Sequence, residues 1–139
     1  MTMRVHLITA TQVFQINEII CTEAGNSAQC YGIGKVESAL HSAFYPGAVP
    51  FVHGGIAKIA GALAYYLVKA HAFFDGNKRT ALISSATFME LNGLELVYPF
   101  NLANNTNALA DILDDCASSK ISMEDLKNWY ESHKKQIEE

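Results

Sequence analysis

Residues 56–92 read IAKIAGALAYYLVKAHAFFDGNKRTALISSATFMELN, and this stretch decides the fold. Its first part carries apolar side chains at positions i, i+3 and i+4, which predicts an amphipathic helix. That stripe consists of Ile56, Ile59, Ala60, Leu63, Ala64, Leu67 and Val68. Gly55 and Gly61 are expected to let a neighbour approach this helix closely. Its last part, residues 79–92, predicts a second helix that is apolar on most sides, hence central and buried, and that ends at Gly93.

Four further helices are predicted around these two. The first begins with a capping box of Thr9 and Gln12 and ends at Gly25-Asn26. Its inward face is formed by Val13, Ile16 and Ile20. The others are expected over residues 37–44, over 109–116 and after Ser122, the last with Leu126, Trp129, Tyr130 and His133 inward. The remaining expectations are a helix entry at residues 32–35, an extended piece over 94–97 and a solvated helix end over 134–139.

The composition describes a folded chain of one domain, residues 1–139, with 50% apolar and 17% charged residues. A formal net charge of −4 argues against extended nucleic-acid binding, because such domains usually carry a basic excess. Three cysteines without a CxxC pair favour a reducing, cytoplasmic setting over a disulfide framework. The start MTMRVHLITA lacks the features of a signal peptide, and no stretch is apolar for long enough to span a bilayer. We therefore expect a cytoplasmic protein without a membrane or a direct nucleic-acid partner.

The segment between the two central helices concentrates polar side chains. The N-terminus of the helix that follows it offers unpaired N–H groups and a positive dipole, which suit phosphate oxygens. Lys78 and Arg79 add positive charge there, and Gly76 permits a close approach or a positive φ. A carboxylate such as Asp75 is the usual tether for Mg²⁺ beside phosphates, and a histidine such as His71 can take a proton from a hydroxyl. The segment is therefore the candidate active site.

Simpler roles are open to the same residues. His71 can be a satisfied histidine between helices, and Asp75 can be an N-cap with Lys78 and Arg79 on the solvated face. Five polar groups gathered at one helix N-terminus favour the functional interpretation. A zinc site would need a third ligand near His71 and Asp75, and the sequence offers none. Phe73 is expected to point into the core and hold the loop.

Residues 44–52, FYPGAVPFV, resist a helical interpretation because they contain two prolines and a Pro-Gly turn signal. The residues alone leave two alternatives open. One is a hairpin or extended flap, and the other is an ordinary loop that packs its aromatic side chains on the core.

The run HAFFDGNKR over residues 71–79 resembles the signature HxFx[DE][GA]N[GK]R of the Fic/Doc family. The resemblance extends over about residues 9–129, and the short length and the DGNKRTAL run are most similar to its death-on-curing (Doc) branch. It implies an all-α helical bundle around a central helical hairpin, with a short β-hairpin flap. It also implies an enzyme that transfers part of a nucleotide onto a hydroxyl of a target protein.

Roles for individual residues follow from the resemblance. His71 corresponds to the general base and Asp75 to the Mg²⁺ ligand. Asn77 and Arg79 match phosphate-binding positions, assisted by the backbone N–H groups from Gly76 to Arg79. A target-binding flap, which aligns the target as an added strand, corresponds to Tyr45, Pro46, Gly47, Ala48, Val49, Pro50 and Phe51.

Two positions depart from the AMP-transferring majority of the family. Lys78 replaces a glycine of the anion hole, and Leu82 replaces a second arginine. The Doc branch shares both changes, which implies a kinase that transfers the γ-phosphate of ATP or another nucleoside triphosphate. The alternatives are an adenylyltransferase (AMPylator) and a catalytically idle interaction module.

Two protein partners are implied in the same way. The Doc resemblance names elongation factor Tu as the target protein. Many family members carry an inhibitory helix with the pattern [ST]xxxE[GN], and this sequence has no such run. We therefore expect inhibition in trans by a Phd-like antitoxin, which would make the chain the toxin of a toxin–antitoxin pair.

Overall fold

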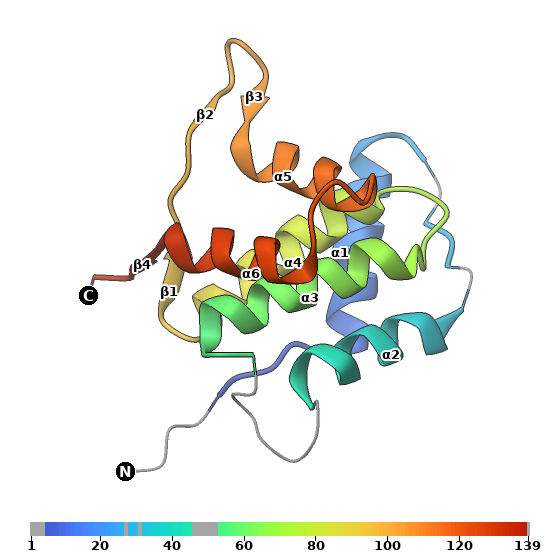
Figure 1. The fold of residues 1–139 in the computed structure, drawn as a ribbon. Coiled ribbons are helices and arrows are strands. Elements are labelled where there is room, and N and C mark those ends of the chain that lie inside the picture. Colours follow the sequence, from blue (N-terminus) through green and yellow to red (C-terminus); the bar gives the residue numbers. More distant parts are fainter. Residues whose placement is uncertain (1–4, 27, 31, 46–52, 139) are drawn as a thin grey trace.

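The computed structural model describes residues 5–26, 28–30, 32–45 and 53–138. Figure 1 shows helices packed around a central pair, with short strands at the margin of the bundle. The helices are α1 (Ala10–Glu23), α2 (Ile33–Phe44), α3 (Ile56–Ala70), α4 (Asn77–Leu91), α5 (Ala108–Ala117) and α6 (Met123–Ser132). The strands are β1 (Leu94–Leu96), β2 (Phe100–Asn101), β3 (Thr106–Asn107) and β4 (Lys134–Gln136). The all-α fold class is confirmed.

Helix α3 lies at the centre of the bundle because it is apolar around most of its circumference. It packs against α2, α4, α5 and α6, while α4 also packs against α1. The core between these helices is formed mainly by aliphatic and aromatic side chains with almost no exposed surface, among them Leu63, Phe88, Met89, Leu109, Leu113, Leu126 and Tyr130. None of the helices in the described part of the chain is long and apolar enough to cross a membrane.

The predicted close approach to α3 occurs at Gly61 and involves α6. A Cβ on Gly61 would lie 2.8 Å from the Cα of Lys127, so only a hydrogen fits between the two backbones. Gly55 has a different role from the one predicted. It is the N-cap of α3 with a φ of +112°, and a Cβ on it would meet no atom within 4 Å.

Helix α1 begins and ends as predicted. Thr9 accepts a hydrogen bond from the backbone N–H of Gln12, whose side chain accepts from the N–H of Thr9, which is the predicted capping box. At the other end Gly25 has a φ of +77°, and the N–H of Asn26 donates to the carbonyl of Cys21 at 2.8 Å.

The inward face of α1 differs by one position from the prediction. Ile16 is only half-buried, while Asn17 is 1% exposed and lies in line with Val13, Ile20 and Cys21. A polar amide thus stands where an apolar side chain was expected.

Other boundaries shift from the sequence-based expectation. Helix α2 begins at Ile33, so the predicted helix entry at residues 32–35 is confirmed, and α4 begins at Asn77 rather than at residue 79. Helix α4 is less apolar than predicted: Ile83 is 37% exposed, whereas Ser85 is buried and bonds the hydroxyl of Tyr130 at 2.8 Å.

The predicted solvated helix end over residues 134–139 is wrong. Lys134–Gln136 forms β4, which pairs antiparallel with the predicted extended piece, β1. The pairing supplies hydrogen-bond partners that a lone strand at the end of α4 would lack. The β2–β3 hairpin was not predicted.

Candidate active site

The α3–α4 connection opens into a cleft of about 380 Å³ at one end of the bundle. The cleft is bounded by the end of α3, the start of α4 and the end of α5. Its lining consists of Val68, His71, Phe74, Asp75, Gly76, Asn77, Lys78, Arg79 and Ala117. The structure therefore brings together all the predicted catalytic, metal-binding and phosphate-binding residues. Of the predicted flap, residues 46–51 lie outside the described residues, and Tyr45 ends α2 away from this lining.

His71 terminates α3 in the left-handed conformation, with φ +46° and ψ +51°. A side chain other than glycine in this region costs about 1–2 kcal/mol. The conformation ends the helix abruptly and leaves the exposed imidazole in the cleft. Backbone strain is thus located at the residue for which catalysis is predicted.

The amide of Asn77 fixes the loop and orients the ring of His71. Its Oδ1 accepts the N–H of Phe73 at 3.0 Å, and its Nδ2 donates to the carbonyl of Phe73 at 2.8 Å and contacts Nδ1 of His71 at 3.3 Å. The two bonds to Phe73 settle which end of the amide is nitrogen. The amide nitrogen of Asn77 therefore faces Nδ1 of His71, and the backbone N–H of Asn77, at the start of α4, remains available to a phosphate.

The start of α4 presents a row of backbone N–H groups to the cleft. Gly76 is its N-cap with a φ of +77°, as its predicted permissive role requires, and its carbonyl accepts from the N–H of Thr80 at 2.8 Å. The three preceding N–H groups, residues 77–79, have no carbonyl within the helix to bond. An added Cβ on Gly76 would lie 3.3 Å from Nδ2 of Asn17, so the glycine makes room toward α1 rather than in the cleft.

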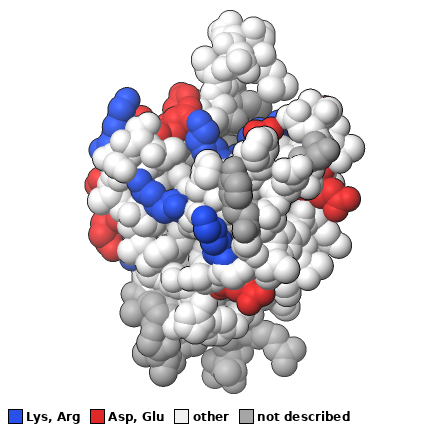
Figure 2. All heavy atoms as spheres, turned by 90° about the vertical axis from the view of Figure 1, so that its right-hand side faces the viewer, with Lys and Arg blue, Asp and Glu red and all other residues white. Residues whose placement is uncertain are grey.

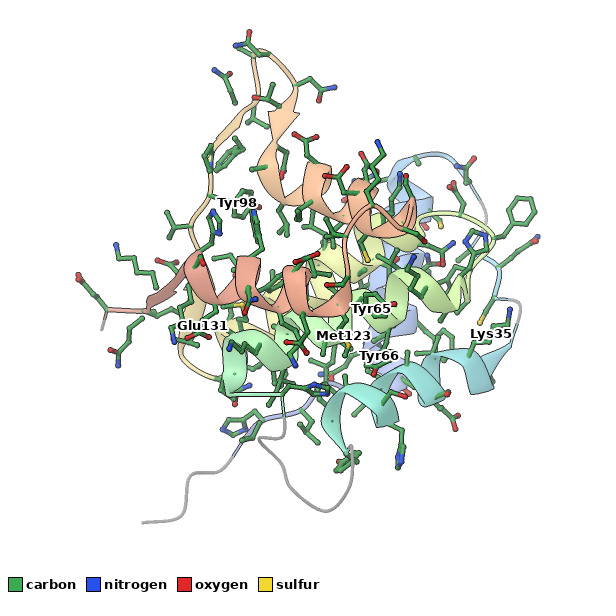
Figure 3. All side chains as sticks on the ribbon, viewed as in Figure 1. Lys35, Tyr65, Tyr66, Tyr98, Met123 and Glu131 are labelled. Carbon is green, nitrogen blue, oxygen red and sulfur yellow. The ribbon has the colours of Figure 1, made fainter. Side chains whose placement is uncertain are left out.

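The two cations of the motif differ in their surroundings. Lys78 forms an ion pair with Asp114 of α5, and both side chains are about half exposed. Such a pair contributes little to stability, but it directs the lysine stem toward α5. Arg79 is exposed and makes no ion pair within the described ranges. Figure 2 shows this end of the molecule, with Lys and Arg side chains gathered on its upper and central part. In Figure 3 the labelled Lys35 of α2 lies at the same end.

The carboxylate of Asp75 is held by hydrogen bonds to both oxygens. Oδ1 accepts the N–H of Gly76 at 2.9 Å, and Oδ2 accepts Nδ2 of Asn26 at 2.8 Å. Over the described ranges no three His, Cys, Asp or Glu side chains form a metal-binding group. The exposed carboxylate of Asp75 beside the start of α4 has the chemistry to hold Mg²⁺ together with substrate phosphates and water.

Sequence reasoning missed two asparagines that support this loop. Asn17 donates to the carbonyl of Asp75 at 2.9 Å and to the hydroxyl of Thr80 at 3.1 Å, and Asn26 binds the carboxylate as described. A polar residue within the apolar face of α1 was the available signal for Asn17. No comparable signal marked Asn26, which the sequence presented only as part of a helix stop.

The predicted anchoring by Phe73 is confirmed. Its side chain is 3% exposed and meets the ring of Phe14 edge-on at 5.7 Å. Its backbone forms an isolated antiparallel bridge with Cys30, and the N–H of Phe74 donates to the carbonyl of Gln29 at 2.9 Å. The α1–α2 connection thus lies directly against the candidate active-site loop (Figure 1).

Comparison with known proteins gives the same assignment. The sequence model of the Fic/DOC family matches residues 7–89, which is more than half of the chain. Over 66 residues the chain is 35% identical to Toxin Doc of Mycolicibacterium smegmatis, a match that covers 47% of this chain and 51% of that protein. The chain thus spans about half the length of that curated relative. Taken with the helical fold and the intact loop motif, these matches establish that the chain belongs to the Fic/DOC family.

Proposed function

We propose that this protein transfers the γ-phosphate of ATP to a serine or threonine hydroxyl of a target protein. The observation that carries the proposal is the single cleft that holds His71, Asp75, Arg79 and the open N-terminus of α4. A base, a metal ligand and phosphate-binding groups are the components that such a transfer requires. Membership of the Fic/DOC family and the similarity to Toxin Doc support it.

Each component has a role in the transfer. The imidazole of His71 takes the proton of the target hydroxyl as the hydroxyl oxygen attacks the γ-phosphorus, and the bond from that phosphorus to the β-phosphate oxygen breaks to release ADP. The N–H groups of residues 77–79 and the guanidinium of Arg79 bind the phosphate oxygens and stabilise their negative charge. Mg²⁺ at Asp75 would neutralise charge on the phosphates. The engaged amide of Asn77 keeps the imidazole turned toward the cleft.

Lys78 and Leu82 favour transfer of phosphate over transfer of AMP. The ion pair with Asp114 directs the stem of Lys78 toward α5, along the cleft that both line, where it would obstruct an α-phosphate. Leu82, one turn further along α4, is half-buried and brings no charge that could hold the β- and γ-phosphates in the pose for AMP transfer.

The proposal is tested by mass spectrometry of bacterial host proteins after expression of the chain. We expect one target to gain a phosphate, with elongation factor Tu the first protein to inspect, and no gain with His71→Ala. A gain of AMP would instead assign the protein as an adenylyltransferase. Unmodified host proteins, with folded chain present, would leave it an interaction module.

We further propose that the chain acts as a toxin restrained by a small antitoxin protein. The similarity to Toxin Doc supports this, as does the lack of an inhibitory [ST]xxxE[GN] run in the sequence. Expression alone should arrest growth, and co-expression of the small protein encoded beside it should restore growth. Normal growth with folded, active protein in the cells would contradict the toxin role.

A further inference from the structure

We propose that Asn26 is a positioning residue that sets the affinity of the Asp75 carboxylate for the divalent cation. The inference rests on the proposed function in one respect, namely that Asp75 is the residue that binds the metal ion. Its basis is the 2.8 Å hydrogen bond from Nδ2 of Asn26 to Oδ2 of Asp75, which joins residues 49 positions apart in the chain.

The end of α1 presents Asn26 in a defined place. Gly25 turns the chain with its positive φ, and the N–H of Asn26 closes the helix end by donating to Cys21. These backbone bonds position Asn26 without using its side chain. The amide is therefore free to reach across to the loop, and substitution of the side chain leaves the helix end intact.

The hydrogen bonds to Asp75 define a single orientation of its carboxylate. Asn17 holds the backbone carbonyl, the N–H of Gly76 holds Oδ1, and Asn26 holds Oδ2. Each carboxylate oxygen retains a second lone pair for a cation. Without Asn26 only the neighbouring N–H of Gly76 would orient the group, and the exposed side chain would regain rotational freedom. Loss of such an outer hydrogen bond typically weakens metal binding by about 10–100-fold.

The side-chain amide of Asn26 carries no charge. A lysine in place of Asn26 would also donate to Oδ2, but its positive charge would oppose the incoming cation. An asparagine orients the carboxylate and leaves its negative charge uncompensated. This combination suits a metal ligand better than it suits a purely structural contact, for which a charged donor would bind more strongly.

The test is the affinity of the purified chain for Mn²⁺ at fixed ADP, followed by the electron paramagnetic resonance signal of the free ion. We expect Asn26→Ala to weaken Mn²⁺ binding about tenfold, the lower end of the range for such contacts because Asn26 is exposed. Binding of metal-free ADP should be unchanged. Gln29→Ala is the matched control, since it alters an exposed side chain of the same connection and keeps the backbone bond to Phe74.

Two further variants separate the possible outcomes. Asn26→Lys should retain the tie to Asp75 and the thermal stability, yet bind Mn²⁺ more weakly than Asn26→Ala does. Wild-type Mn²⁺ affinity in both variants of residue 26 would overturn the inference. Asp75→Ala should lose Mn²⁺ binding. Loss of Mn²⁺ binding in Asp75→Ala together with wild-type Mn²⁺ affinity in the Asn26 variants would overturn only the positioning role of Asn26. Wild-type Mn²⁺ affinity in Asp75→Ala would also overturn the metal-binding role of Asp75 in the proposed function.

Discussion

Two of the contacts that hold the central hairpin of α3 and α4 do so by different means. Against α6, the backbone of Gly61 approaches the Cα of Lys127 so closely that an added Cβ would lie 2.8 Å from it, and the neighbouring Leu63 and Leu126 are fully buried. Against α1, the loop after α3 is held by hydrogen bonds from Asn17, an amide that is 1% exposed. The contact with α6 depends on a close steric fit between the two helices, and the contact with α1 depends on directional hydrogen bonds.

The difference shows that the α6 contact mainly stabilises the bundle, whereas the α1 contact mainly positions the candidate active-site loop. Apolar packing contributes free energy in proportion to buried area and has no preferred direction. Hydrogen bonds from a buried amide contribute less net free energy, yet they fix the position of the carbonyl of Asp75 and of the first turn of α4. Changes at the α6 contact should therefore alter stability, and changes at the α1 contact should alter activity more than stability.

The largest effect is expected at the strained end of α3. His71→Ala should lower the rate of transfer by about 10²–10⁴-fold, the usual contribution of a general base, while thermal unfolding stays close to that of the wild type. His71→Gly should be equally inactive but more stable than His71→Ala by about 1 kcal/mol, because glycine adopts the left-handed conformation without strain. Transfer assays and thermal melts check both. An active His71→Ala protein would contradict the proposed mechanism.

A smaller effect is expected at the contact of α3 with α6. Gly61→Ala should lower the free energy of unfolding by about 1–3 kcal/mol, because the added methyl group overlaps backbone atoms that cannot rotate away. Gly34→Ala in α2 is the matched control: its Cβ would meet nothing within 4 Å, so helix propensity should raise stability by up to about 1 kcal/mol. Urea unfolding measures both changes. Equal free energies of unfolding for the two variants would show that the close approach of α6 does not exclude a side chain at residue 61.

The α1 contact provides the converse test. Asn17→Leu keeps the number and branching of the side-chain heavy atoms but removes the donors to Asp75 and Thr80, which should lower stability by about 1 kcal/mol. The rate of transfer per folded molecule should fall by more than this loss of stability explains, whereas Gly61→Ala should leave that rate unchanged. Rates of transfer divided by the folded fraction of each variant show whether activity falls independently of stability. Parallel losses in both variants would remove the distinction between the two contacts.

The smallest effect concerns His53, which is buried and contacts the carbonyl of Ser42 at 3.3 Å. Burial lowers its pKa from the ordinary 6.5, with the nearby Lys127 acting in the same direction, while the bond to Ser42 and the charge of Glu124 oppose the shift. The unfolded chain therefore binds the proton more readily, and stability should decline as the pH falls below 6.5. His53→Gln should make the unfolding temperature less dependent on pH in that range. An unchanged pH dependence would exclude His53 as its source.

Much of the bundle was predictable because its helices carry local signals. The capping box of Thr9, the stripe along α3 and the stop at Gly93 each encode an element within a few neighbouring residues. Errors arose where a distant partner decides the structure. Lys134–Gln136 is a strand because β1 offers an unpaired edge, and the charged sequence carries no trace of that edge.

The candidate site was likewise predictable where its residues are neighbours in the sequence, and not where a distant residue contributes. The motif places its residues in one loop, so His71 and Asp75 were found without any tertiary information. Gly76 was predicted to permit a close approach or a positive φ; its φ is positive, and the close approach that its missing Cβ allows is to Asn17 of α1. Asn26 lies far from the motif in sequence, and only the packing of α1 on the loop brings it to Asp75.

The most direct test of the central claim is to incubate the purified chain with a bacterial extract and ATP labelled at either the γ- or the α-phosphate. We expect γ-labelled ATP to label a target protein, α-labelled ATP to label none, and His71→Ala to abolish the signal. Lys78→Gly should weaken the γ-label, since the stem that obstructs the α-phosphate pose would be gone. Labelling of the target by α-labelled ATP in the wild-type protein would contradict the assignment as a phosphotransferase.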